Sequence, residues 1–287
     1  MNKQLARTVP DHFNTPTRSS WPTNGLSGLS AGLYRASTTR VVLATLGLLC
    51  LIGLWSIGVW LLQQRIGLAA LLGPGQTFHS LFDLVFDNQL TIHAITSLKR
   101  VLVGLTLAVL IGVPLGLALG HSRILENSTS GAFQFLRMIS PLSWMPIAVM
   151  IFGIGDAPIY FLLTFAAVWP IMMNTAAGVK QLNPQWVLLA NSLSATRLER
   201  LRHIVIPGIM SHLLTGVRLA IGIIWIVLVP CEMLGVSSGL GYFILDTRDR
   251  LAYSELMAVI VLIGALGFTL DLAAQKLHQR YTGGIRR

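Results

Sequence analysis

Four charged side chains lie at or within long apolar stretches of the sequence. They are Arg137, Arg218, Glu232 and Asp271. If these stretches cross a membrane, each charge must face a cavity or a partner, or reach the interface by snorkelling. Arg137 and Asp271 lie near the ends of their stretches, which favours snorkelling. For Arg218, a role in a pathway and contact with the interface are equally good interpretations.

Glu232 has a more specific expectation because it follows Pro230 near the end of an apolar stretch. We expect it either to gate a pathway or to hold Arg100 or Arg248 in a structural ion pair. Direct contact with an anionic ligand is disfavoured, because like charges repel.

Three further side chains in the apolar stretches are candidates to line a pathway, although packing is the commoner role of such residues. They are Trp144, Met145 and Trp169. Four glycines recur at spacings of four and eight residues, which is typical of close helix packing. They are Gly104, Gly112, Gly116 and Gly120.

The other residue types argue against several chemistries. The histidines show no metal-ligand spacing, and no GxxxxGK(S/T) loop is present to cradle the phosphates of ATP. No constellation of acid, base or metal ligands points to an enzyme. The basic residues behind the net charge of +10 lie between apolar stretches, so nucleic acid is not an expected partner. Cys50 and Cys231 fall in apolar stretches and do not indicate a disulfide framework.

The composition places these residues in a membrane protein. Hydrophobic residues make up 53% of the 287 residues and charged residues only 11%, against about 25% in a soluble domain. A helix of about 20 apolar residues crosses a bilayer, and the runs are continuous rather than alternating. We therefore predict an all-α polytopic membrane protein with six transmembrane helices. The predicted spans are 41–64, 101–120, 138–155, 157–179, 208–232 and 256–273.

Six spans place both termini on one side of the membrane. That side holds fourteen basic residues and three acids, whereas the other holds five basic residues and six acids, with Arg100 and Asp156 counted in its loops. Because basic loops stay in the cytoplasm, we predict that both termini are cytoplasmic.

The parts outside the spans have their own expectations. Residues 1–39 are polar without apolar periodicity, which predicts a disordered cytoplasmic tail; a cleaved signal peptide is disfavoured because the leader is too long. Residues 40–280 form the transmembrane domain, and 281–287 a second cytoplasmic tail. Residues 78–86 have the spacing of an amphipathic helix on the outer surface.

The segment from Lys180 to Pro207 is the longest polar connection within the bundle. Asn183 followed by proline is typical of a helix start, and Thr196 and Glu199 have the spacing of a capping box. The pattern predicts two cytoplasmic helices within 183–205. On pattern alone, a helix that merely coats the membrane surface is an equally good interpretation.

Residues 188–207, LLANSLSATRLERLRHIVIP, resemble the EAA loop of ABC importer permeases. That loop has the form E-A-A, Gly, nine residues, then I-x-L-P. Ala190 matches the last Ala, Ser194 stands at the Gly position, and the I-x-I-P ending at Pro207 has the right distance. Leucines replace the Glu and the middle Ala. Serine is acceptable for glycine if the turn needs no positive φ, since it can cap the next helix instead.

Other segments carry the same resemblance, namely 97–120, 140–155 and 232–248. Together they are similar to the nitrate/sulfonate/taurine-type permeases, which are binding-protein-dependent inner-membrane components, over about residues 40–280. The resemblance implies a type I ABC importer permease (MetI-like) fold in a bacterial inner membrane, and a transport subunit rather than an enzyme. It also implies a homodimer, two ATPase subunits, and a periplasmic binding protein that delivers a small, mostly anionic solute.

In that resemblance ATP and Mg are used by the ATPase, and the permease itself binds no cofactor. The residues implied to line the ATPase contact are Leu189, Ala190, Ser192, Ser194, Ala195, Ile204 and Pro207. The pathway or gate candidates are Glu232, Arg218, Trp144, Met145 and Trp169. The main alternative is an ion-gradient-driven transporter with Glu232 or Asp271 as proton carrier, for which no internal repeat is found.

Overall fold

The computed structural model describes residues 26–86 and 89–285. In these two ranges all regular structure is helical, which confirms the all-α prediction. The chain divides into two units at Gly58, and each is described by itself.

The first unit contains most of α1 (Leu26–Gln63), a helix of 38 residues. Its part from Thr45 to Gln63 is long and apolar enough to cross a membrane. The disordered tail predicted for 1–39 is wrong for residues 26–39, which belong to α1, while residues 1–25 lie outside the described part. The physical reason is that extending an existing helix costs far less than starting one.

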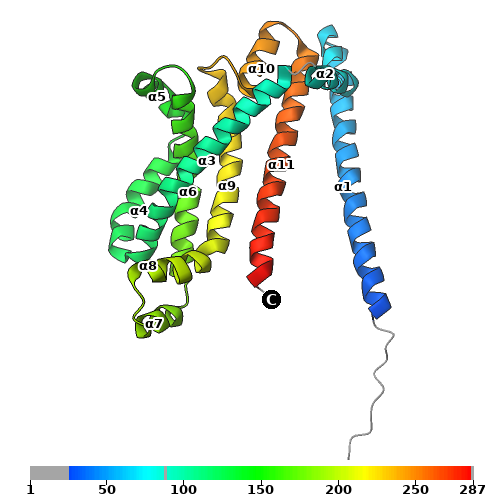
Figure 1. The fold of residues 1–287 in the computed structure, drawn as a ribbon. Coiled ribbons are helices and arrows are strands. Elements are labelled where there is room, and N and C mark those ends of the chain that lie inside the picture. Colours follow the sequence, from blue (N-terminus) through cyan, green and yellow to red (C-terminus); the bar gives the residue numbers. More distant parts are fainter. Residues whose placement is uncertain (1–25, 87–88, 286–287) are drawn as a thin grey trace, which may run out of the picture. The chain divides into compact units, whose positions relative to one another are not determined.

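The second unit holds the remaining helices (Figure 1). They are η2 (Gly67–Leu72), α2 (Pro74–Phe86), α3 (Gln89–His121), α4 (Arg123–Met138), η3 (Pro141–Trp144), α5 (Met145–Phe152), α6 (Asp156–Lys180), α7 (Pro184–Ser192), α8 (Arg197–Arg200), the π-helix η4 (Leu201–Val205), α9 (Ile206–Met233), α10 (Leu240–Asp249) and α11 (Tyr253–Ile285).

Five helical segments in the described residues are long and apolar enough to cross a membrane. They are Thr45–Gln63, Leu90–His121, Asp156–Lys180, Arg197–Met233 and Tyr253–Tyr281. A sixth arises if α4 and the η3–α5 segment, which meet at a bend of 86°, are counted as one broken span. The last helix continues to Ile285, so the separate tail predicted for 281–287 is helical as far as the structure describes it.

The continuous helix predicted over 138–155 is wrong. The apolar run is divided after Met138, because Pro141 disfavours helical backbone at the residue before it and Pro146 lacks a backbone donor. The polar stretch before it forms α4, which Ser122 caps by accepting a hydrogen bond from the backbone N–H of Leu125 at 3.3 Å. Gly153 and Gly155, with φ of +77° and +134°, then turn the chain into α6.

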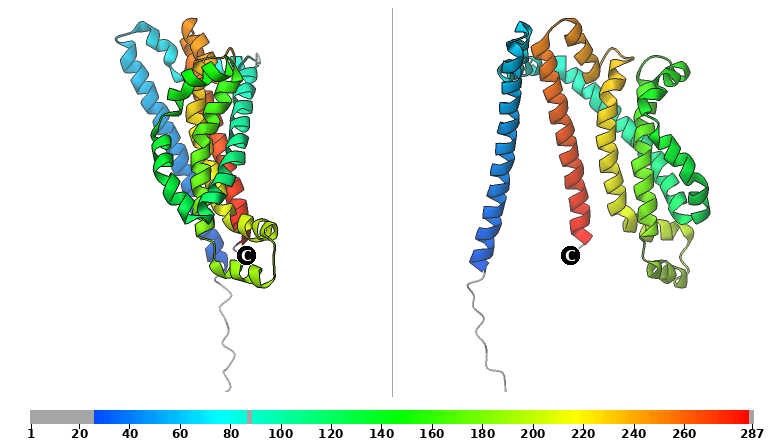
Figure 2. Two further views of the ribbon diagram at one scale, coloured as in Figure 1. Left: turned by 90° about the vertical axis from the view of Figure 1, so that its left-hand side faces the viewer. Right: turned by 180° about the vertical axis from the view of Figure 1, so that it is seen from behind.

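Helix α6 is the centre of the second unit and packs against both α3 and α9, which lie beside it in Figure 2. Leu162, Leu163, Ala167 and Ile171 of α6 are fully buried. A Cβ atom at Gly104 of α3 would lie 2.7 Å from the Cβ of Leu163, so only glycine permits this approach. The interpretation of the α3 glycines as packing residues is therefore confirmed.

The second unit has two distinct ends. The α7–α8 loop and the C-terminal end of α11 lie at one end, and α5 and α10 lie at the opposite end (Figure 1). The predicted amphipathic helix at 78–86 is part of α2, which packs against α11.

Candidate functional site

The first helix of the α7–α8 loop begins as the sequence predicts. The Asn183 side-chain oxygen accepts a hydrogen bond from the backbone N–H of Gln185 at 2.9 Å, and Pro184 opens α7. The cap satisfies one of the backbone donors that a helix start leaves free.

The turn after α7 differs from expectation at Ser194. Its φ is +53°, in the left-handed region that favours glycine. Ser194 does not cap the next helix either, because that position belongs to Thr196. Serine was expected to be acceptable here if the turn needed no positive φ, because serine could then cap the next helix. The turn does have a positive φ, and Ser194 is not the cap, so this expectation is wrong. The turn is held by the N–H of Ala195, which donates to the carbonyl of Ala190 at 2.9 Å.

The second helix begins with the predicted capping box. Thr196 Oγ1 accepts from the Glu199 N–H at 3.3 Å, and the Glu199 carboxylate accepts from the Thr196 N–H at 2.8 Å. Arg200 Nη1 donates to the Asn191 side-chain oxygen at 2.9 Å, which ties α8 to α7. From α8 the helix continues through the π-helix η4 into α9 without a break.

The surface of this loop is unusually apolar. Trp186, Leu188, Leu189 and Leu193 are between 53% and 73% exposed. Ala190 is only 3% exposed, so its methyl group packs inside the chain and is not offered to a partner, contrary to the prediction. Ser192, Ser194 and Pro207 are exposed, and Ala195 is half-buried. Ile204 lines a hollow of about 970 Å³ between the loop and the adjoining ends of α3 and α6.

A buried ionic cluster lies at the opposite end of the bundle. Arg100 of α3 has a side chain only 2% exposed. Its Nη1 donates to Glu232 Oε1 and to the carbonyl of Ser238, both at 2.7 Å. Its Nη2 and Nε donate to Asp156 Oδ1 at 2.6 and 3.0 Å.

Glu232 is fully buried, and three groups donate hydrogen bonds to its carboxylate. Besides Arg100, Ser97 Oγ lies 2.8 Å from each carboxylate oxygen, and the Gly241 N–H donates at 2.9 Å. The predicted pair with Arg100 is confirmed, whereas Arg248 pairs with its neighbour Asp249. Arg100 and Asp156 do not lie in outer loops as assumed, because α3 begins at Gln89 and α6 at Asp156.

Sequence reasoning missed the role of Asp156. Its only local signal is its place as the first residue of a helix, where an acid is favourable. Its partner is 56 residues away in the sequence.

Arg218 and Asp271 form a two-pronged ion pair between α9 and α11. Nε and Nη2 of Arg218 donate to the two carboxylate oxygens at 2.8 and 2.9 Å. Snorkelling was expected for Asp271, but each charge has the other as partner.

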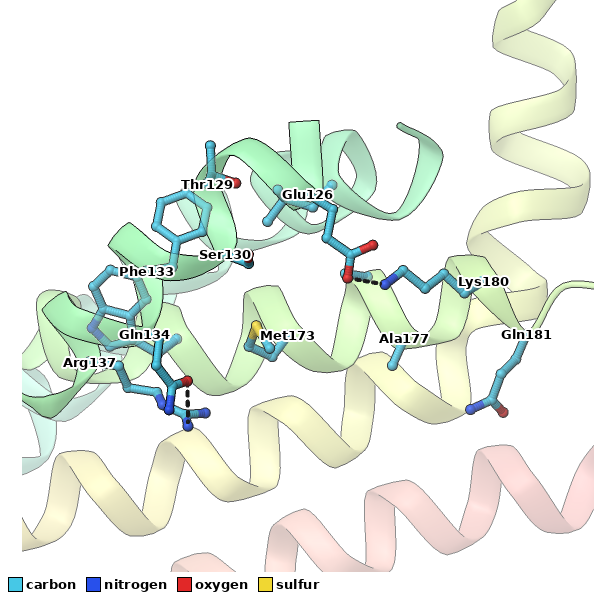
Figure 3. Close-up of a pocket in the computed structure, with 13 residues that line it drawn as sticks. Glu126, Thr129, Ser130, Phe133, Gln134, Arg137, Met173, Ala177, Lys180 and Gln181 are labelled. Carbon is cyan, nitrogen blue, oxygen red and sulfur yellow. Dashed lines mark hydrogen bonds and ion pairs between the residues drawn. The ribbon is translucent and has the colours of Figure 1, made fainter. Parts of the chain in front are cut away.

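Trp144, Met145 and Trp169 belong to the packing around α6. Met145 is 7% exposed and lies in the apolar core. Trp144 packs on Phe165 with ring centroids 5.7 Å apart, and Trp169 packs between Phe165 and Phe133 at 5.6 and 5.8 Å. Trp169 also lines the cavity between α4 and α6 that Figure 3 shows.

The sequence from 108 to 283 matches the family described as binding-protein-dependent transport system inner membrane component. The chain belongs to this family. The permease is 36% identical over 187 residues to the bicarbonate transport system permease protein CmpB of Synechococcus elongatus, covering 64% of this chain and 67% of that protein.

Two further relatives carry related names. The nitrate import permease protein NrtB of Synechocystis sp. is 31% identical, with 68% of this chain and 73% of that protein covered. The taurine transport system permease protein TauC of Escherichia coli is 33% identical, with 68% and 71% covered. An inward-facing structure of the MetNI methionine ABC transporter matches 64% of this chain and 92% of its own at a TM-score of 0.55 and 18% identity, which shows the same fold.

This permease is thus the membrane subunit of an ATP-driven ABC importer and not an enzyme. It is a multi-pass inner-membrane protein whose partners are an ATPase and a binding protein. The family decides against the ion-gradient-driven transporter, and both acids that such a transporter would use are held by arginines.

Proposed function

We propose that the α7–α8 loop binds the ATPase subunit and passes its movement to the bundle. The exposed apolar surface of the loop, formed by Trp186, Leu188, Leu189 and Leu193, is the observation that supports this most. Apolar patches of this kind in a polar environment are typical of protein contacts. The residues on or next to this surface are Leu189, Ser192, Ser194 and Ala195. Ala190 is buried and packs behind it.

The connection to the bundle suits transmission of movement. The Arg200–Asn191 hydrogen bond joins the two short helices, and one continuous helix leads from α8 to the buried ionic cluster at Glu232. The π-helix η4, which ends two residues before Pro207, is the one irregular turn described in this helix. Such turns occur often at functional sites.

The assembly we propose contains two copies of this chain, two ATPase subunits and one periplasmic binding protein. ATP and Mg belong to the ATPase, and this chain holds no cofactor of its own. The relatives are named for three different solutes, bicarbonate, nitrate and taurine, each of which carries an oxyanion group. This supports a small anionic solute for this permease.

We further propose that both termini and the α7–α8 loop face the cytoplasm. Arg123, Lys180 and Arg197 lie at the loop end of the bundle, in agreement with the positive-inside rule. A membrane-impermeant thiol reagent should label an Arg197→Cys variant only from the cytoplasmic side. Labelling from the periplasm would reverse the orientation.

Co-purification of the ATPase tests the docking surface. Leu189→Glu places a charge in the middle of the apolar patch and is expected to reduce the recovered ATPase by at least about tenfold. Leu234→Glu is the matched control, because Leu234 is equally exposed, at 62% against 61%, and follows α9 at the opposite end of the bundle. Equal ATPase recovery in the two variants would refute the docking assignment.

A further inference from the structure

A cavity of about 340 Å³ lies between α4 and α6. Figure 3 shows Arg137 and Gln134 at one end, and Lys180 and Gln181 with Glu126 at the other. Phe133, Trp169 and Met173 contribute to its apolar wall. The volume is that of a site for a small molecule.

The positive charges at the two ends of the cavity differ in whether an acidic side chain neutralises them. Lys180 forms an ion pair with Glu126, which neutralises that end. Arg137 has no ion pair with any residue that the structure describes, and its Nη2 donates only to the side-chain oxygen of Gln134 at 3.3 Å. The cavity therefore carries one uncompensated positive charge, beside the free amide nitrogen of Gln134.

Arg137 also lies deeper than the sequence suggests. It is fourteen residues beyond the start of α4 at Arg123, or about 21 Å along the helix. Trp169, which lines the same cavity, is eleven residues before Lys180 in the 25-residue α6, or about 16 Å from that end. Arg137 does not lie at the near end of the bundle, as the sequence suggested, because the whole of α4 separates it from that end. Its side chain is exposed in the isolated chain, and a charge in the middle of a membrane-spanning segment usually faces the route of a solute or ion.

We propose that this cavity binds the oxyanion group of the transported solute on its way toward the α7–α8 end, with Arg137 as the charge that selects for anions. The guanidinium offers a planar fork that matches carboxylate, nitrate or sulfonate groups. The aromatic and thioether wall suits a ligand whose remaining part is small and apolar. The inference rests on the proposed anionic solute but not on the proposed ATPase contact.

Fluorescence quenching in the assembled transporter tests the site. The permease with its ATPase subunits is placed in nanodiscs of zwitterionic lipid, and nitrate serves as both oxyanion probe and quencher of indole fluorescence. The signal of Trp169 is the difference between the protein and its Trp169→Phe variant. Arg137→Gln is expected to lower the nitrate quenching constant of Trp169 by about tenfold, because a positive charge lining the cavity raises the local concentration of anions.

Two controls separate charge from access. Arg123→Gln removes an arginine from the same helix outside the cavity and should leave nitrate quenching unchanged. Acrylamide, a neutral quencher, should act equally on all variants. Arg137→Lys keeps the charge and should keep most of the nitrate quenching, which maintains the test if the glutamine variant disturbs packing.

Two results would overturn the proposal. One is equal nitrate quenching in Arg137→Gln and the unaltered permease. The other is loss of nitrate quenching in nanodiscs with phosphatidylglycerol, which would assign the cavity to a lipid phosphate. Arg137→Gln should still co-purify with the ATPase, so this proposal and the docking assignment fail independently.

Discussion

At the residue scale, Ser194 determines how the two short helices of the loop are oriented. With φ at +53° it adopts a conformation that costs an L-residue about 1 kcal/mol and glycine nothing. Ser194→Gly should therefore favour the observed turn and tighten ATPase binding by about fivefold, measured as a Kd.

Ser192→Gly is the control for this substitution, since residue 192 is the last of helix α7. Glycine there destabilises the helix, and we expect weaker rather than tighter ATPase binding. Weaker binding in Ser194→Gly as well would mean that the turn changes when the ATPase is bound.

The Arg100 cluster has larger energetic consequences, because its charges are buried. Glu232→Gln removes the buried carboxylate from Arg100 and leaves it only the half-exposed Asp156 as an ionic partner, which should cost up to about 3–5 kcal/mol and lower the Tm of the purified permease. Asp249→Asn breaks an exposed pair with Arg248 and should cost less than about 1 kcal/mol. Similar Tm values in the two variants would contradict the structural role of Glu232.

At this scale the sequence predicts contacts between residues that are close together along the chain. The cap at Asn183 and the box of Thr196 and Glu199 are correct because each depends on residues within three positions. The sequence predicts the Arg100–Glu232 pair only as one of several alternatives, and Asp156 is missed. These contacts join residues 132 and 56 positions apart, and only the packing of three helices brings them together.

At the element scale, the contact between α3 and α6 depends on the absence of side chains. A Cβ atom at Gly116 would lie 2.6 Å from the Cβ of Thr175 and as close to the Met172 carbonyl. Gly116→Ala is expected to push the helices apart at a cost of about 1–3 kcal/mol, measured as a lower Tm.

Gly222→Ala in α9 is the matched control, because no atom lies within 4 Å of its Cβ position. Alanine there should leave the Tm unchanged or raise it, since it is the better helix former. A Tm for Gly116→Ala as high as that of Gly222→Ala would contradict the packing.

The broken α4–α5 segment shows that an apolar run of the right length does not always form one continuous transmembrane helix. The run 138–155 has the length of one span, but Pro141 and Pro146 divide it. The amphipathic helix α4 supplies the other part of the broken span. A search for uniformly apolar stretches overlooks this helix because one of its faces is polar. The other spans follow from continuous apolar runs, although α3 and α11 extend well beyond their predicted bounds.

At the scale of the whole molecule, we propose that ATP-driven movement enters the bundle at the α7–α8 loop. One end of the second unit offers an exposed apolar surface on this loop, and the opposite end is fixed by buried charges. Helices α6 and α9 extend between these two ends. If the loop binds the ATPase as proposed, these two helices connect that contact to the opposite end of the bundle.

Site-directed photo-cross-linking tests whether the ATPase contacts this loop. A photoreactive benzoyl-phenylalanine at position 189 of the assembled importer should give an adduct with the mass of this chain plus one ATPase subunit. The same probe at position 234 should give no such adduct. An ATPase adduct from position 234 and none from position 189 would contradict the account.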